Sequence, residues 1–249
     1  MDKNTRYFHN IASVRRRSNQ VDALVINEIL VRNQVRIKIA IRDFNKSLYH
    51  QEVLPLIGFQ DGLVNRIPDE EVAKSERMSS VDEIKDAVWD CESSKVPCCD
   101  GYNMNFIKKC WRDIGSDFTI AVMDFFQFAT LPRDSNVTWV ALPPKFVGAK
   151  EIKDIRPINM VGCVYKVISK VLIRIMRRVM PGLVRETQSA FVKGRKIHDK
   201  ALIACETVQW LKMKKKSLAI VNLDFQKAYD KVRWSFVDII LQKMRFGQK

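Results

Sequence analysis

The stretch that decides the fold is residues 221–230, VNLDFQKAYD. Val221 and Leu223 alternate with a polar residue, as in a β-strand, and Asp224 follows at the end of the apolar run. A strand that ends in a carboxylate, before a turn into a helix, fixes an oxygen atom where water can reach it, which suits a metal ligand. An aspartate at this place can equally cap the next helix. The spacing alone leaves both interpretations open.

Around this stretch the chain combines few strands with long helices, which predicts an α+β fold. The strongest helix signal covers residues 161–180, where apolar residues recur at helical spacing until Pro181 and Gly182 end the pattern. Residues 21–44 indicate helix interrupted by turns. Further helices are predicted near residues 81–89, 106–111, 120–128, 199–211 and 232–244. Strands or extended segments are predicted at 137–142, 155–158 and 217–223.

The composition indicates a folded, strongly basic chain. Of its 249 residues 47% are hydrophobic, which excludes wholesale disorder. Lysine and arginine number 43 against 28 aspartate and glutamate residues, so the formal net charge is +15. Such an excess predicts a polyanionic partner, nucleic acid before an acidic membrane surface.

Much of this charge lies between Lys145 and Lys200, which contain fourteen basic residues and four acidic ones. Along the helix predicted at 161–180, basic residues fall on or beside the polar side, where they could follow a phosphate backbone: Lys166, Lys170, Arg174, Arg177 and Arg178. Lys193 and Arg195 extend the set beyond the helix. The alternative is a solvated charged face without a partner.

Several other kinds of protein and site are disfavoured. The longest apolar stretch is interrupted by three basic residues, so no membrane span is predicted, and no apolar run follows Met1, so we expect an intracellular chain. The six cysteines have no C-x-x-C spacing, which predicts free thiols. Adjacent Cys98 and Cys99 make a poor zinc site, and His198 has no neighbouring metal ligand.

Residues 223–232 (LDFQKAYDKV) resemble the first catalytic motif of the reverse transcriptases of LINE-type (non-LTR) retrotransposons, as found in plant genomes. Four further blocks resemble the same family in the same order: residues 4–9 (NTRYFH) its spacer, 100–102 and 106–111 (DGY, FIKKCW) its entry segment, 154–159 and 165–170 (DIRPIN, YKVISK) its fingers motif, and 188–195 (QSAFVKGR) its next block. Two turns depart from the family pattern, at residues 96–99 and 143–145.

The resemblance implies a right-hand polymerase fold of which the chain carries the fingers and the start of the palm. It divides the chain into a helical spacer (1–75), a helical entry segment (76–135), and the fingers with the first palm motif (136–249). The family's paired catalytic aspartates belong to a later palm hairpin, and the sequence ends at Lys249 before it. We therefore expect a truncated domain that is inactive as a polymerase when isolated.

The resemblance also implies roles for individual residues. Asp224, with the backbone carbonyl of Phe225, is expected to bind Mg²⁺ in a two-metal site of the full-length parent. Tyr229 is expected under the sugar of the incoming deoxynucleoside triphosphate, with a core side chain as the alternative. Arg156 and Lys145 are expected on the triphosphate, with solvated surface charges as the alternative.

The sequence thus predicts a fragment of an RNA-directed DNA polymerase, with an RNA template, a DNA primer and deoxynucleoside triphosphates as partners and no membrane. The main alternative is a catalytically inactive basic nucleic-acid-binding module. A basic helical adaptor for acidic proteins or anionic lipid is disfavoured, because the ordered motifs argue against it and the basic helix lacks an opposing face rich in Trp and Phe.

Overall fold

The structure is a computed structural model that describes residues 9–11, 13–14, 20–50, 62, 64–221, 223 and 228–247. The chain forms two compact units, each assembled from three separate stretches. One unit comprises Met1–Glu52, Val88–Phe118 and Leu131–Lys166, and the other comprises Val53–Ala87, Thr119–Thr130 and Val167–Lys249. This grouping follows spatial neighbours, whereas the predicted boundaries after residues 75 and 135 follow the order of the motifs.

The first unit begins with a β-hairpin. Strands β1 (Leu24–Ile26) and β2 (Ile29–Val31) pair antiparallel, and helix α2 (Gln34–Leu48) follows. Asn27 and Glu28 both have positive φ, the conformation that two-residue hairpin turns require and that asparagine tolerates. The prediction of interrupted helix across residues 21–44 is therefore wrong for the hairpin, because the turn residues outweigh the apolar periodicity.

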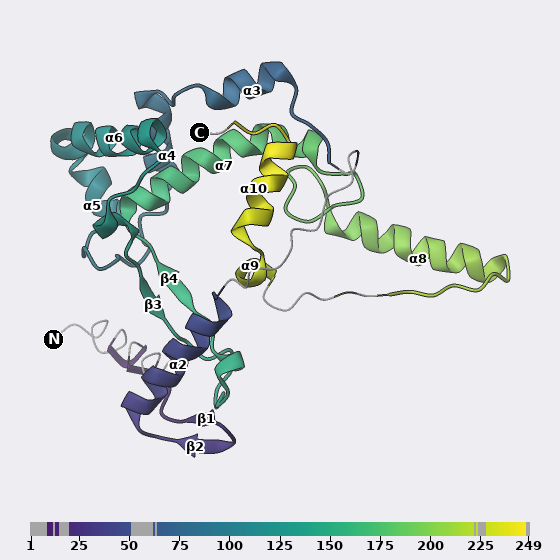
Figure 1. Cartoon of the computed structure of the whole chain (residues 1–249), viewed down its shortest axis with the longest axis horizontal. Helices are drawn as coiled ribbons and strands as arrows, with labels where there is room; N and C mark the ends of the chain where they lie inside the picture. Colours follow the sequence, from purple (N-terminus) through teal and green to yellow (C-terminus); the bar gives the residue numbers. More distant parts are fainter. Residues whose placement is uncertain are drawn as a thin grey trace. The chain divides into compact units, whose positions relative to one another are not determined.

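A second antiparallel ribbon carries part of the same core. Strand β3 (Trp139–Ala141) confirms the strand predicted at 137–142, although it is shorter, and β4 (Ile158–Met160) begins where the extended segment predicted at 155–158 ends. The same register continues to an isolated bridge between Pro144 and Ile155. Ile155 is buried in one cluster with Leu24, Ile37 and Ile41. Figure 1 shows both ribbons together with α2.

The predicted helices form with ends shifted by at most three residues, except that the helix predicted at 120–128 begins nine residues earlier. They are α4 (Val81–Asp90), α5 (Met104–Lys109), α6 (Trp111–Phe128) and α8 (Ile197–Met213), together with the strongly predicted α7 (Cys163–Leu183). Helix α7 continues through Pro181, which was predicted to end it. The proline lies so close to the C-terminus that the helix loses only one late hydrogen bond.

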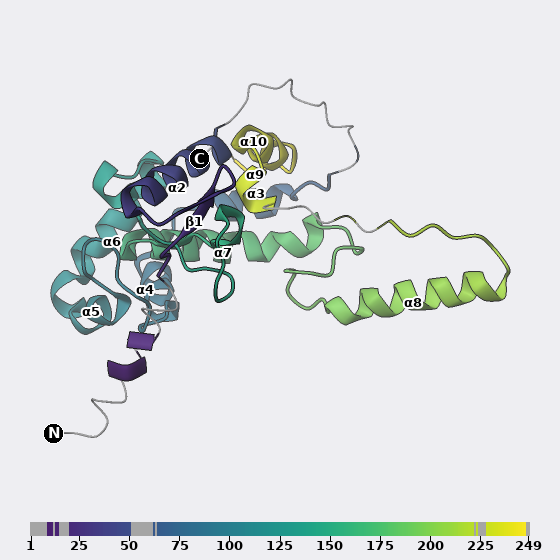
Figure 2. The ribbon, with the colours of Figure 1, turned by 90° about the horizontal axis from the view of Figure 1, so that it is seen from below.

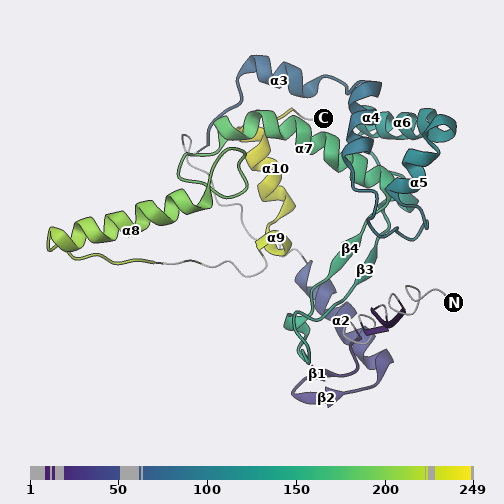
Figure 3. The same cartoon turned by 180° about the vertical axis from the view of Figure 1, so that it is seen from behind.

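The second unit packs the end of the chain against α7. Its remaining helices are α3 (Asp69–Glu76), α9 (Ala228–Lys231) and α10 (Trp234–Lys243). Ile67, Val179 and Leu183 form a buried cluster that Met244 and Phe246 contact, and the Ile67 N–H donates to the Met244 carbonyl at 2.9 Å. Figure 3 shows α10 reaching the C-terminal end of α7.

The strand predicted at residues 217–223 is absent from its described residues. After α8 the chain runs back along that helix without regular structure (Figure 2), and Ile220 lines a shallow depression with Ala204 and Val208. Val221 and Leu223 are 77% and 72% exposed. The apolar alternation is present, but the described part of the chain offers no strand to pair with it, and an unpaired strand is unstable in water.

Within the described residues, no helix is long and apolar enough to cross a membrane.

All six cysteines are free, as predicted. Cys163 is buried, and its thiol lies 3.5 Å from the Tyr102 carbonyl oxygen. Burial raises the pKa of the Cys163 thiol to about 11, because the thiolate loses its hydration.

We predict that iodoacetamide at pH 8 alkylates exposed Cys205 well before Cys163, because the thiolate is the reactive species and the Cys163 thiol stays protonated and covered. Peptide mass spectrometry over time measures both rates. In guanidinium chloride the two rates should converge, and equal rates in the folded chain would contradict the described burial.

Candidate nucleic-acid interface

The β3–β4 ribbon brings two predicted phosphate-binding residues onto one face. The register pairs Trp139 with Met160 and Pro144 with Ile155, so Lys145 is level with Asp154 and Arg156 is level with Pro143. Backbone hydrogen bonds support this alignment, from Lys145 N–H to Asp154 at 2.8 Å and from Arg156 N–H to Pro143 at 2.9 Å. Since side chains alternate between the two faces, Lys145 and Arg156 lie diagonally on the face opposite buried Ile155.

The two cations differ in how they are held. The Lys145 Nζ donates to the Lys153 carbonyl oxygen at 2.5 Å and lies 3.9 Å from the Asp154 carboxylate. Arg156 is exposed. The ribbon therefore presents one tethered ammonium group and one exposed guanidinium group on the same side, an arrangement that suits a ligand with several phosphate oxygens.

Helix α7 separates its apolar and basic residues. Val167, Ile168, Val171 and Val179 are buried, whereas the Lys170 and Arg174 side chains are half-buried and Arg177 and Arg178 are exposed. With 3.6 residues per turn, the four cations lie within about 100° of the helix circumference, and Lys166 in the first turn widens the arc to about 120°. We call Lys170, Arg174, Arg177 and Arg178 the basic face of α7.

Arg195 has a different environment. Its guanidinium group donates four hydrogen bonds to backbone carbonyl oxygens at the end of α7 and in the loop that follows it. The acceptors are Pro181, Val184, Arg185 and Gln188, at donor–acceptor distances of 2.6–3.0 Å. Carbonyl groups at a helix C-terminus lack partners inside the helix and favour a cation. The structure therefore gives Arg195 the role of holding the loop after α7, whereas neighbouring Lys193 is exposed on that loop.

The predicted palm residues are described only in part. Asp224 and Phe225 lie outside the described residues. Tyr229 in α9 is 88% exposed, so in this structure it is not the core side chain of the alternative interpretation. The described residues contain no group of three or more His, Cys, Asp or Glu side chains that could hold a metal ion. The proposed metal role of Asp224 rests on its sequence motif alone.

Sequence reasoning missed a group of polar residues between α3 and α4. Ser80 and Glu83 form a capping box, in which the Ser80 N–H donates to Glu83 Oε2 at 2.9 Å and the Glu83 N–H donates to Ser80 Oγ at 3.2 Å. The Arg77 guanidinium group donates to Glu83 Oε1 at 2.6 Å. The serine before acidic residues predicts the start of α4, but nothing in the sequence predicts that Arg77 and α7 converge there.

Comparison with known proteins adds two findings. Residues 145–249 match the family model described as reverse transcriptase (RNA-dependent DNA polymerase). The chain is also 24% identical, over 251 aligned positions, to the transposon TX1 uncharacterized 149 kDa protein of Xenopus laevis. That alignment covers 99% of this chain and 19% of the relative, so the chain spans about a fifth of the relative's length. Both findings confirm the resemblance that the sequence motifs predict.

We predict that Arg195→Ala and Arg195→Lys both destabilise the fold by about 2 kcal/mol, because neither side chain can donate to four carbonyl oxygens at once. Thermal unfolding measures the loss, and faster proteolysis within residues 184–196 locates it. Lys193→Ala is the matched control and should leave both measurements unchanged. Full stability of Arg195→Lys would show that only the charge of Arg195 matters.

Proposed function

Because residues 145–249 match the family model of reverse transcriptases, we propose that this chain forms the fingers and the first palm motif of an RNA-directed DNA polymerase of a non-LTR retrotransposon. In this proposal the whole protein copies an RNA template into DNA from a primer and deoxynucleoside triphosphates. The contribution of this chain is to hold the nucleic-acid strand and to supply part of the nucleotide site.

The observation that carries the proposal is the basic face of α7 inside the matched segment. Four cations lie on one side of a helix, beside a buried apolar stripe that includes Val167, Val171 and Val179. A row of cations along a helix follows the spacing of backbone phosphates and releases condensed counterions when a strand binds, whatever the base sequence. The face therefore suits a template or primer strand that must move during synthesis.

The β3–β4 ribbon supports a nucleotide subsite. Lys145 and Arg156 lie on one face, and in the proposal they contact the triphosphate, with the guanidinium group of Arg156 able to bind two oxygen atoms at once. Exposed Tyr229 would lie against the sugar and disfavour a 2′-hydroxyl. Asp224, with the Phe225 carbonyl, would hold Mg²⁺, which prefers oxygen ligands and would neutralise charge on the phosphates.

The second candidate is a basic nucleic-acid-binding module without catalysis. It is supported by the same basic face and needs neither Asp224 nor Lys145. The two candidates therefore agree on strand binding and differ on metal-dependent binding of nucleotide, so each requires a separate measurement.

For strand binding, we predict that the chain binds a single-stranded RNA with little base preference and that Lys170→Gln/Arg177→Gln lowers the salt dependence. Each lost phosphate contact should reduce the slope of log K against log salt by about 0.7, or about 1.4 for the pair. Fluorescence anisotropy of a labelled oligonucleotide over a range of salt concentrations gives the slope.

The matched control is Lys38→Gln/Lys46→Gln, which removes two exposed lysines from α2 and so gives the same net charge. This variant should retain the slope of the unchanged chain. If both double variants lower the slope equally, binding depends on total charge and the basic face has no special role.

For the nucleotide site, we predict that Asp224→Asn weakens metal-dependent binding of a fluorescent deoxynucleoside triphosphate by at least about tenfold, because a neutral amide is a poor ligand for a divalent cation. Titrations with and without Mn²⁺ isolate the metal-dependent part. Asp230→Asn, in the same motif, is the control and should bind as the unchanged chain does. Equal binding with and without Mn²⁺ would favour the non-catalytic module.

A further inference from the structure

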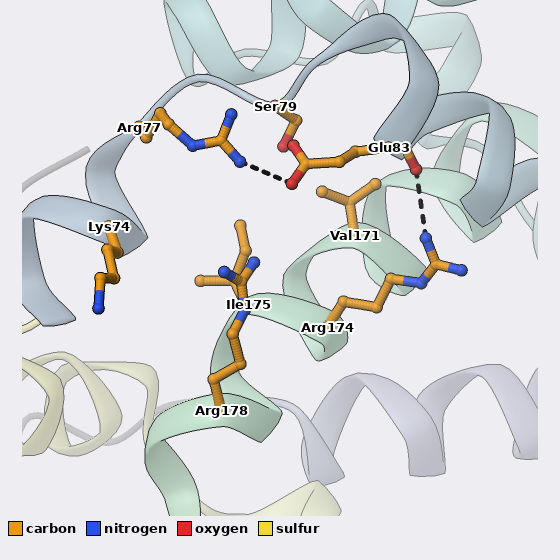
Figure 4. A pocket seen from close by; sticks show the side chains of 8 residues that line it. All are labelled: Lys74, Arg77, Ser79, Glu83, Val171, Arg174, Ile175 and Arg178. Carbon is orange, nitrogen blue, oxygen red and sulfur yellow. Dashed lines mark hydrogen bonds and ion pairs between the residues drawn. The ribbon is translucent and has the colours of Figure 1, made fainter.

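A pocket of about 90 Å³ opens beside α7, within the second unit. Its walls come from the end of α3, from the linker and first turn of α4, and from α7. The residues that line it are Lys74, Arg77, Ser79, Glu83, Val171, Arg174, Ile175 and Arg178. Figure 4 shows the side chains of Arg77, Arg174 and Arg178 converging on the region around Glu83. This volume is several times the space that one water molecule needs.

The charges around the pocket do not cancel. Lys74 pairs with Glu70 and Glu71, at 2.7 and 3.0 Å. Arg77 pairs with Glu83 at 2.6 Å. The pocket also contains the guanidinium groups of Arg174 and Arg178.

Arg174 and Arg178 are held differently. One nitrogen of Arg174 donates to the Glu83 backbone carbonyl oxygen at 3.3 Å. The described part of the chain gives Arg178 no hydrogen-bond or ion-pair partner within 4 Å, although its charge acts on Glu83. The pocket is therefore electropositive, and Arg178 is available to an incoming anion.

Glu83 acts as an anion already inside the site. The hydrogen bond from the Ser80 backbone N–H, followed by the Arg77 guanidinium and the more distant Arg178, lowers the pKa of the Glu83 carboxyl. Glu83 therefore stays ionised at neutral pH and occupies one donor edge of Arg77. The five N–H donors of an arginine leave Arg77 able to bind a second acceptor.

We propose that this pocket binds one phosphate group of a nucleic-acid backbone and that Glu83 limits its affinity. The inference rests on the proposed function, since Arg174 and Arg178 belong both to the pocket and to the basic face of α7. A strand that follows this face reaches the pocket without leaving the helix. Planar guanidinium groups bind phosphate oxygens in pairs, and the Ser79 hydroxyl offers a further donor.

The decisive variant is Glu83→Gln. A glutamine oxygen accepts the hydrogen bond from the Ser80 N–H as the carboxylate does, so the capping box is retained while the competing charge is removed. We expect this variant to bind RNA about three- to fivefold more tightly at 0.15 M salt. Arg178→Gln should bind about three- to fivefold more weakly and reduce the salt slope by about 0.7, the effect of one phosphate contact.

The controls separate this inference from the proposed function. Lys170→Gln and Arg177→Gln change the basic face without changing the pocket lining. If these variants weaken RNA binding while Glu83→Gln and Arg178→Gln do not change it, the phosphate pocket is overturned and strand binding by α7 stands. If the unchanged chain binds no RNA, the proposed strand binding itself fails. Thermal unfolding and circular dichroism confirm that each variant is folded.

A further experiment distinguishes a pocket that binds a backbone phosphate from one that binds a free anion. Inorganic phosphate is titrated against chloride at constant ionic strength, and the unfolding temperature of the unchanged chain and of Arg178→Gln is measured. Stabilisation by phosphate that Arg178→Gln abolishes, together with weaker RNA binding by that variant, is the expected result. Stabilisation by phosphate with unchanged RNA binding would assign the pocket to a free anion and overturn the inference.

Discussion

The arrangement of the second unit depends on burial of the apolar side of α7. Val167, Ile168, Val171 and Val179 leave water together, and each contributes roughly 1.5–3 kcal/mol of transfer free energy when it is fully buried. A helix that buries one side has no freedom to turn about its axis. The basic residues are therefore fixed on the remaining arc by packing, without any contact between the charges themselves.

The α3–α4 linker uses the same few polar atoms for two purposes. The Glu83 side chain satisfies a backbone N–H at the start of α4, and its charge also positions Arg77 beside α7. The Glu83 backbone carbonyl accepts from Arg174 on α7. Local helix capping and the position of two guanidinium groups are thus coupled through one residue, so a substitution there is expected to affect folding and electrostatics together unless it preserves the cap.

Local signals explain which features the sequence predicts. The helical periodicity of residues 161–180 predicts α7 and its basic side, because both follow from spacing along one helix. The strand at 217–223 is predicted but does not form among the described residues, because a strand needs a partner that alternation cannot supply. The pocket joins Arg77 to Arg178 across a hundred positions of the sequence, and Arg195 turns back onto α7. Such contacts arise from tertiary packing, which a single sequence does not display.

The continuous register of the β3–β4 ribbon also determines which changes in chain length it can accept. The loop between the strands carries exposed residues, including Val147 at 89% exposure, so insertions or deletions there need not disturb the pairing. A single-residue deletion inside either strand has a different effect, since it moves every following side chain to the opposite face. A deletion in 156–160 would disrupt the pairing with β3, and one in 142–144 would move Lys145 to the opposite face of the ribbon. Length variation should therefore be tolerated at the tip of this hairpin and excluded from its arms.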